Sequence, residues 1–162
     1  MLFRSGVDLP AEQQPQMARI NLDISALQSL FLTQLQSATA TWTKRIDDIE
    51  RLSGLSRATK DRLALNAQQA GHDGWLMRLD QNTYQQVMTR AEDRALREEY
   101  FVAYTTRASD QGPHAGQFDN GPVLELLLAR RHQKARLLGY ENFAQLSLET
   151  EMAESTDRKS VV

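Results

Sequence analysis

The sequence predicts a mainly α fold, a helical bundle of about five to seven helices with one short extended segment near residues 75–80. Apolar residues recur every three or four positions through most of the chain, which is the spacing of one buried helical face. Glycines and prolines separate these periodic stretches, at places where helices end and begin. Residues 71–82 depart from the helical spacing and are bounded by glycine and by Asp-Gln-Asn.

The first helix is predicted from a long apolar stripe. Its members are Met17, Ile20, Ile24, Leu27, Phe31, Leu35, Ala38 and Trp42. Pro10 fits a first helical turn, where its missing N–H costs nothing, but Pro15 moves the regular start toward itself. From Pro15 to Asp47 this helix would measure about 50 Å at about 1.5 Å per residue, so it needs long neighbours.

A second helix is predicted after the break at Ser53-Gly54. Ser56 is its expected N-cap, and the helix extends to Ala70, where Gly71 supplies the left-handed backbone that ends it. We expect these first two helices to form an antiparallel pair. In the segment GHDGWLMRLDQN that follows, apolar side chains alternate along residues 75–79, which predicts a short strand or extended crossing.

Two shorter helices are predicted next. One runs from Thr83 to Arg90, and the other begins at Asp93. Asp93 and Arg97 are four residues apart, so we expect them to pair on the helix surface. The apolar face of the second of these helices comprises Leu96, Tyr100, Ala103 and Tyr104.

The segment SDQGPHAGQFDNGP, residues 109–122, is the clearest loop, with three glycines and two prolines in fourteen residues. It lacks the Gly-Lys-Ser/Thr of a phosphate loop and the alternating oxygen ligands of a calcium loop. A lid or recognition role and a simple connector both remain open. Asn120 then caps a helix with Pro122 in its first turn and Gly139 at its end, and a further helix is expected from Tyr140 to Met152.

Length and composition bound the class of protein. A chain of 162 residues predicts a single helical domain over residues 1–162, with a disordered tail at 156–162. Its 41% hydrophobic and 25% charged residues are ordinary globular usage, and the net charge of -2 gives no support to nucleic-acid or membrane binding. Cysteine is absent and the N-terminus has no secretory pattern, so we expect a cytoplasmic location.

The three histidines, His72, His114 and His132, have no spacing that predicts a metal site. A His-Glu-x-x-His helix needs two imidazoles four residues apart to reach one zinc ion, and no pair here meets that requirement. His72 and His114 lie in predicted loops and His132 on a helix among charged neighbours. We therefore assign no catalytic, cofactor-binding or metal-binding residue from the spacing.

A basic run in ARRHQKARLLGYENF raises a second functional question. Arg130, Arg131, Lys134 and Arg136 spread around the predicted helix, whereas a flat binding patch would cluster them. Cations near a helix C-terminus are favoured by the helix dipole, and their stems pack along apolar surface. A structural role is thus the expected one, and no Gly-x-Ser-x-Gly elbow or carboxylate dyad offers a catalytic alternative.

Five separated segments, in order and spacing, resemble the oligopeptidase A branch of the thimet oligopeptidase-like zinc metallopeptidases. They are LPAEQQ at 9–14, ATATWTK at 38–44, GWLMRLDQNTYQQVMTRAEDRALREEYFVAYTTR at 74–107, TRASDQGPHAGQFDNGP at 106–122 and RRHQKARLLGYENFAQLSLETEMAES at 130–155. The resemblance covers about residues 3–155 and implies an internal piece of the non-catalytic helical half of such an enzyme.

The resemblance also implies a cytoplasmic endopeptidase of short peptides, with zinc on a His-Glu-x-x-His helix and a distant glutamate that lie outside this segment. No residue here matches those ligands, so none is carried over, and the chain alone is expected to be inactive. Leu137, Leu138, Tyr140, Phe143 and Leu146 are expected packing residues, with His132 in the scaffold. Alternatives are an interaction module that self-associates through exposed apolar helix faces or binds peptide or the missing enzyme parts, and an unrelated hydrolase using His114 or His132.

Overall fold

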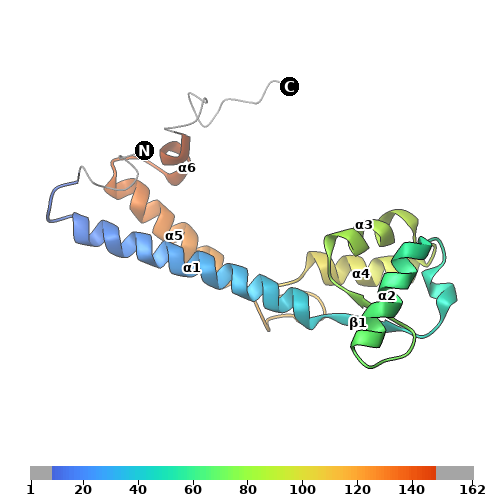
Figure 1. Cartoon of the computed structure of the whole chain (residues 1–162). Coiled ribbons are helices and arrows are strands. Elements are labelled where there is room, and N and C mark those ends of the chain that lie inside the picture. Colours follow the sequence, from blue (N-terminus) through green and yellow to red (C-terminus); the bar gives the residue numbers. More distant parts are fainter. Residues whose placement is uncertain (1–8, 149–162) are drawn as a thin grey trace, which may run out of the picture. The chain divides into compact units, whose positions relative to one another are not determined.

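The computed structural model describes residues 9–148, and it confirms a mainly helical fold. The elements in chain order are α1 (Gln14–Thr41), β1 (Thr43–Ile46), the 3-10 helix η2 (Ile49–Leu52), α2 (Arg57–Gln69), β2 (Trp75–Arg78), α3 (Gln81–Arg90), α4 (Arg94–Thr105), α5 (Gly121–Leu137) and α6 (Phe143–Leu148) (Figure 1). Within the described part of the chain, no helix is both long and apolar enough to cross a bilayer.

Two compact units make up the chain. The first unit combines the residues up to Phe31 with those from Pro122 onward, and the second unit is Leu32–Gly121. α1 therefore contributes its N-terminal part to the first unit and its C-terminal part to the second. A single domain over residues 1–162 stays a prediction, and the expected disordered tail at 156–162 lies outside the described residues.

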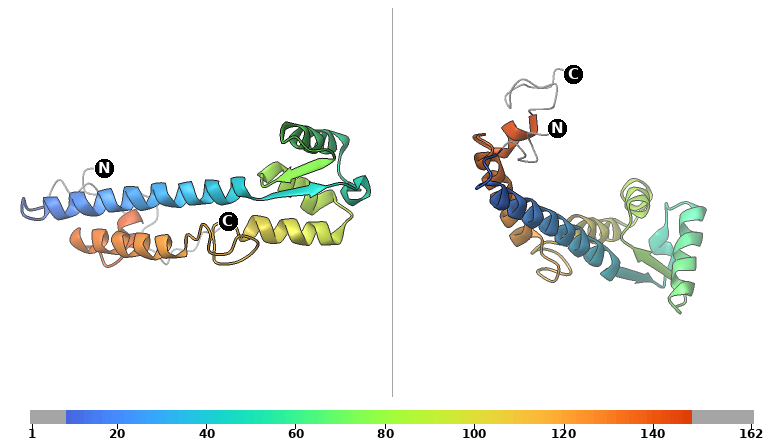
Figure 2. Two further views of the ribbon diagram at one scale, coloured as in Figure 1. Left: turned by 90° about the horizontal axis from the view of Figure 1, so that it is seen from below. Right: turned by 60° about the vertical axis from the view of Figure 1, so that its left-hand side comes forward.

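In the first unit, the N-terminal part of α1 lies beside α5 (Figures 1 and 2). α5 ends as predicted, because Gly139 takes φ +86° and the Tyr140 N–H donates to the Ala135 carbonyl at 2.9 Å. Helix α6 begins at Phe143 and not at Tyr140, since the Asn142 side chain caps it by accepting from the Gln145 N–H at 3.0 Å. The remainder of the helix predicted to Met152 lies outside the described residues. Buried apolar side chains of this unit are Met17, Ile20, Val123, Leu127, Ala135 and Leu146.

The second unit contains a two-stranded antiparallel sheet, in which Thr43 pairs with Arg78 and Ile46 with Trp75. β2 confirms the predicted extended segment. Its partner was missed, because the first helix was expected to continue to Asp47 and instead ends at Thr41. Pairing with β2 gives one edge of residues 43–46 its backbone hydrogen-bond partners and is compatible with burial of Ile46, so tertiary contacts override the helical spacing.

α2 begins at the predicted cap, where the Ser56 hydroxyl accepts from the Thr59 N–H at 3.2 Å, and Gly71 follows it with φ +74°. The expected antiparallel pairing with the first helix is wrong, because α2 packs on β2, while α3 packs against α4. The core of this unit comprises Trp42, Ile46, Leu52, Leu55, Leu63, Met77, Leu79, Val87, Ala91, Leu96, Tyr100 and Ala103.

The surface pair expected between Asp93 and Arg97 is also wrong. Asp93 is the N-cap of α4 and accepts from the Leu96 N–H at 3.0 Å, and its other oxygen accepts from Arg51 Nε at 2.9 Å. Arg97 donates instead to the backbone carbonyl of Ala91. A cap position turns the carboxylate toward the free N–H groups of the first turn, away from the helix side where the i+4 residue lies.

Candidate functional site

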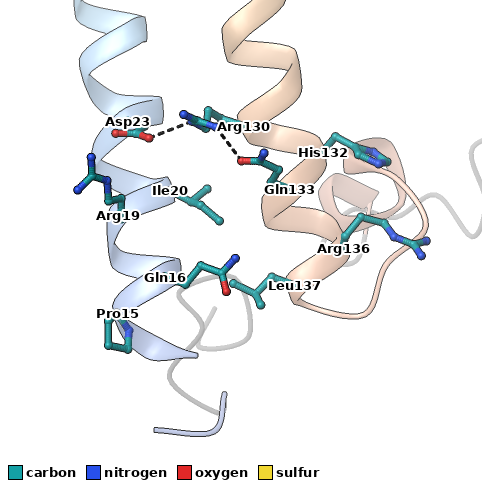
Figure 3. A pocket seen from close by; sticks show the side chains of 10 residues that line it. All are labelled: Pro15, Gln16, Arg19, Ile20, Asp23, Arg130, His132, Gln133, Arg136 and Leu137. Atoms are coloured by element: carbon teal, nitrogen blue, oxygen red, sulfur yellow. Dashed lines mark hydrogen bonds and ion pairs between the residues drawn. The ribbon is translucent and has the colours of Figure 1, made fainter. Parts of the chain in front are cut away.

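The larger of two candidate sites is a groove of about 800 Å³ in the first unit, between the N-terminal part of α1 and α5 (Figure 3). The side chains of Ile20 and Leu137 supply apolar surface to it, and Gln16 and Gln133 supply amides. The complete lining is Pro15, Gln16, Arg19, Ile20, Asp23, Arg130, His132, Gln133, Arg136 and Leu137. Amide and apolar groups can hold a ligand, but the lining contains no Ser, Thr or Cys nucleophile.

An ion pair crosses this groove between the two helices. Arg130 Nε donates to Asp23 Oδ2 at 2.9 Å, and Arg130 also donates to Gln133 Oε1 at 3.0 Å (Figure 3). A second crossing bond runs from Lys134 Nζ to Asn21 Oδ1 at 2.8 Å. Two cations of the basic run thus connect α5 to α1, which is a structural use of their charge.

The other basic side chains of the groove do not converge on its interior. Arg19 projects from the outer side of α1, and His132 and Arg136 project from the far side of α5 (Figure 3). Arg131 lies over the Phe143 ring, with its guanidinium carbon 5.2 Å from the ring centroid. The predicted spread of the basic run around its helix is confirmed. Among the expected packing residues, Leu146 is buried and Leu137, Leu138, Tyr140 and Phe143 are half-buried.

A second cavity, of about 600 Å³, lies in the second unit, and we call it the arginine cavity. Its lining is Leu35, Gln36, Thr39, Ala40, Thr43, Arg78, Leu79 and Arg107. These residues come from the C-terminal part of α1, the start of β1, the end of β2 and the turn after α4. No sequence signal indicates this cavity, because its two arginines are 29 positions apart (78 and 107) and line one cavity only in the folded chain.

An aromatic cluster supports the arginine cavity from within the core. The buried Tyr100 ring meets Trp42 edge to face, with centroids 5.4 Å apart, and its hydroxyl donates to the Arg78 carbonyl at 2.7 Å. Tyr84 and Tyr104 stack at 4.2 Å, and the Arg107 guanidinium carbon lies 3.8 Å from the Tyr104 centroid. Arg107 also donates to the Tyr104 carbonyl at 2.6 Å. Both arginines therefore emerge from backbone that is fixed by tyrosines.

Two titratable groups have shifted pKa values, and both serve the fold. Burial raises the pKa of the Tyr100 hydroxyl above its usual value of 10.0. The Leu96 backbone N–H, followed by Arg51, lowers the pKa of Asp93 below 3.8. General acids and bases need a pKa near the working pH, and both shifts lead away from neutrality.

The histidines do not come together. His72 and His114 lie in loops of the second unit, as predicted, while His132 lies on α5 in the first unit. Across residues 9–148 no three His, Cys, Asp or Glu side chains are grouped so that they could hold a metal ion. The described residues therefore do not fit a zinc site.

Sequence comparison places these units in a known family. A model of peptidase family M3 matches residues 87–160. Oligopeptidase A of Salmonella typhimurium is 44% identical over 151 residues, and that of Escherichia coli 42% identical over 151 residues; the match covers 93% of this chain in both cases. The chain belongs to peptidase family M3. It spans about 22% of the length of both enzymes, so it corresponds to a segment of an M3 oligopeptidase A homologue.

M3 relatives differ in location. Two from Arabidopsis thaliana, 34% and 33% identical, are named a probable cytosolic oligopeptidase A and an organellar, chloroplastic/mitochondrial one. The family thus includes cytosolic and organellar forms, and the cytoplasmic location of this chain stays a prediction. The M3 family uses zinc.

Proposed function

We propose that this chain is part of the helical scaffold of a zinc-dependent peptidase that cleaves short peptides, and that the chain alone has no peptidase activity. The observation that carries the proposal is 44% identity to an oligopeptidase A along 93% of the chain. The contacts of the described residues support it, since the shifted carboxyl and hydroxyl, Asp93 and Tyr100, are occupied by capping and core hydrogen bonds. In the complete enzyme, zinc and the group that activates water would lie elsewhere in the protein.

A segment exchange tests the scaffold role. Residues 9–148 of this chain replace the matching segment of the Salmonella typhimurium oligopeptidase A, and hydrolysis of a quenched fluorescent peptide is measured. We expect the chimera to keep peptidase activity, because 44% identity preserves a core that tolerates volume-conserving replacement. A matched chimera carrying Tyr100→Ala should lose stability and activity together. A folded, zinc-loaded chimera with no turnover would contradict the proposal.

A second measurement concerns the isolated chain. Purified protein is assayed with the same peptide, with and without added zinc, and its bound metal is measured by mass spectrometry. We expect no turnover above the blank. Zinc-dependent turnover that is abolished by the double substitution His114→Ala and His132→Ala would instead establish the hydrolase alternative.

Self-association through exposed apolar helix faces is the alternative function, and it stays a prediction. Leu124, Leu126 and Leu128 on α5 are 44%, 53% and 62% exposed. Sedimentation velocity at increasing concentration tests the alternative directly. A strictly monomeric chain would exclude it.

A further inference from the structure

We propose that the arginine cavity binds the C-terminal end of a short peptide, with Arg78 and Arg107 holding the α-carboxylate and the apolar wall holding the last side chain. The choice of a peptide as ligand rests on the proposed function. The binding chemistry rests on the cavity itself and is tested without turnover.

The arginine cavity has basic side chains without acidic partners among the described residues. The cavity is lined by two arginines, Arg78 and Arg107, and by no acidic residue. Throughout the described part of the chain, neither Arg78 nor Arg107 lies within ion-pair distance of an acidic side chain, whereas other arginines such as Arg51 and Arg130 have acidic partners. Guanidinium groups bind carboxylates through paired N–H donors, so this cavity is complementary to an anion of that shape.

The Arg107 side chain is held in place before any ligand binds. Its guanidinium stacks on Tyr104, and it donates one N–H to the Tyr104 carbonyl. An arginine has five N–H donors, so donors remain for a carboxylate after this bond is made. Because the side chain is already ordered, less conformational entropy is lost on binding.

Arg78 approaches the cavity from a fixed strand end. Its carbonyl accepts from the Tyr100 hydroxyl, and its backbone pairs with Thr43 in the sheet. The next residue, Leu79, is 5% exposed and contributes to the cavity wall. The cation and the apolar wall are therefore held by the same short segment.

The apolar wall selects the kind of carboxylate. Leu35, Ala40 and Leu79 line the cavity beside the two arginines. A peptide C-terminus carries a carboxylate and a side chain on one Cα atom, so a terminal leucine can present both groups to adjacent walls at once. Internal aspartate or glutamate carries its charge at the end of the side chain and leaves the apolar wall uncovered. The volume of about 600 Å³ suits one to a few residues.

Fluorescence anisotropy with the complete 162-residue chain tests this site. The probe is an N-terminally fluorescein-labelled Ala-Ala-Ala-Leu with a free carboxylate, and it is compared with the same peptide as a C-terminal amide. We expect the free acid to bind about fivefold tighter or more, because the amide lacks the charge-assisted hydrogen bonds. Arg78→Gln and Arg107→Gln should each remove most of this preference.

Two further variants separate the site from general effects of charge and folding. Arg57→Gln removes the same charge from a side chain that is 95% exposed on α2, outside the cavity, and it should leave the preference unchanged. Ala40→Phe keeps both arginines and fills the cavity from an exposed helix position, so it should abolish binding of the acid. Circular dichroism confirms that each variant is folded.

Equal affinity for acid and amide, or a preference that survives both arginine substitutions, would overturn the proposal. A peptide amide with an internal glutamate that binds as tightly as the free acid would overturn the assignment to the C-terminus. An inactive chimera beside a chain that prefers the free acid would contradict only the proposed function. An active chimera beside a chain without that preference would contradict only this inference.

Discussion

Removal of the Tyr100 hydroxyl by Tyr100→Phe tests the packing that supports the second unit. The ring is completely buried and the hydroxyl donates to the Arg78 carbonyl at 2.7 Å, while the Asp80 N–H donates to the hydroxyl oxygen at 3.3 Å. Phenylalanine preserves the ring and its edge-to-face contact with Trp42. It leaves the Arg78 carbonyl and the Asp80 N–H without this partner.

We expect Tyr100→Phe to lower the free energy of unfolding of the second unit by about 1–3 kcal/mol, the cost of leaving a partly buried polar group unsatisfied. Urea unfolding followed by tryptophan fluorescence measures this value by linear extrapolation. Both tryptophans of the chain, Trp42 and Trp75, belong to the second unit, so the signal reports on that unit. Tyr104→Phe is the matched control, because among the described residues the Tyr104 hydroxyl has no hydrogen bond.

The pH dependence of the free energy of unfolding provides a second test of Tyr100. Burial raises the pKa of Tyr100 in the folded chain, while an unfolded tyrosine titrates near 10. Above pH 10 the unfolded state releases a proton that the folded state keeps, so stability falls with rising pH, by at most about 1.4 kcal/mol per pH unit. The stability difference between wild type and Tyr100→Phe should therefore shrink above pH 10. A loss below about 0.5 kcal/mol at pH 7, or one equal to that of Tyr104→Phe, would refute the reasoning.

Two further predictions concern the ends of helices in the same unit. Asp93→Ala should lower the free energy of unfolding by about 1–2 kcal/mol at pH 7, because it removes an N-cap and the partner of Arg51. Urea titrations at decreasing pH should show a smaller loss as the pH falls through the lowered pKa of Asp93, below 3.8, because the wild-type carboxylate is then protonated. Gly54→Ala should lower the melting temperature more than Gly71→Ala does. Both glycines have positive φ, but a Cβ at Gly54 would lie 1.9 Å from the Arg90 carbonyl oxygen, whereas one at Gly71 meets no atom within 4 Å. Equal shifts for the two glycines would argue against that close approach.

Helix ends that are set by a capping side chain or a glycine were predictable, because these signals are local. The Ser56 cap, the glycine at position 71 and the glycine at position 139 act through neighbours within a few residues, and each has the expected role in the structure. The extended segment at residues 75–78 was equally visible from its alternating side chains. These signals need no information about distant segments.

Features that depend on distant segments were missed. Thr43–Ile46 continues a helical spacing, and only its pairing with Trp75–Arg78, about thirty residues away, makes it a strand. The arginine cavity depends on that pairing and on the Tyr100 bond to the Arg78 carbonyl, so it had no sequence signal of its own. The ion pair between Asp23 and Arg130 joins residues 107 positions apart and was missed for the same reason.

The direction of the pKa shifts favours a scaffold role over an independent catalytic one. An enzyme site tunes a carboxyl upward or a hydroxyl downward, so that a proton moves near neutral pH. Asp93 and Tyr100 are shifted the opposite way, because the first is stabilised as an anion at a helix end and the second is buried as a neutral hydroxyl. The lowered pKa of Asp93 stabilises the folded state at pH 7, whereas Tyr100 is neutral there in both the folded and the unfolded state; both residues belong to the unit that contains Arg78 and Arg107. The two shifts therefore agree with the proposed scaffold role, in which both groups serve the folded structure.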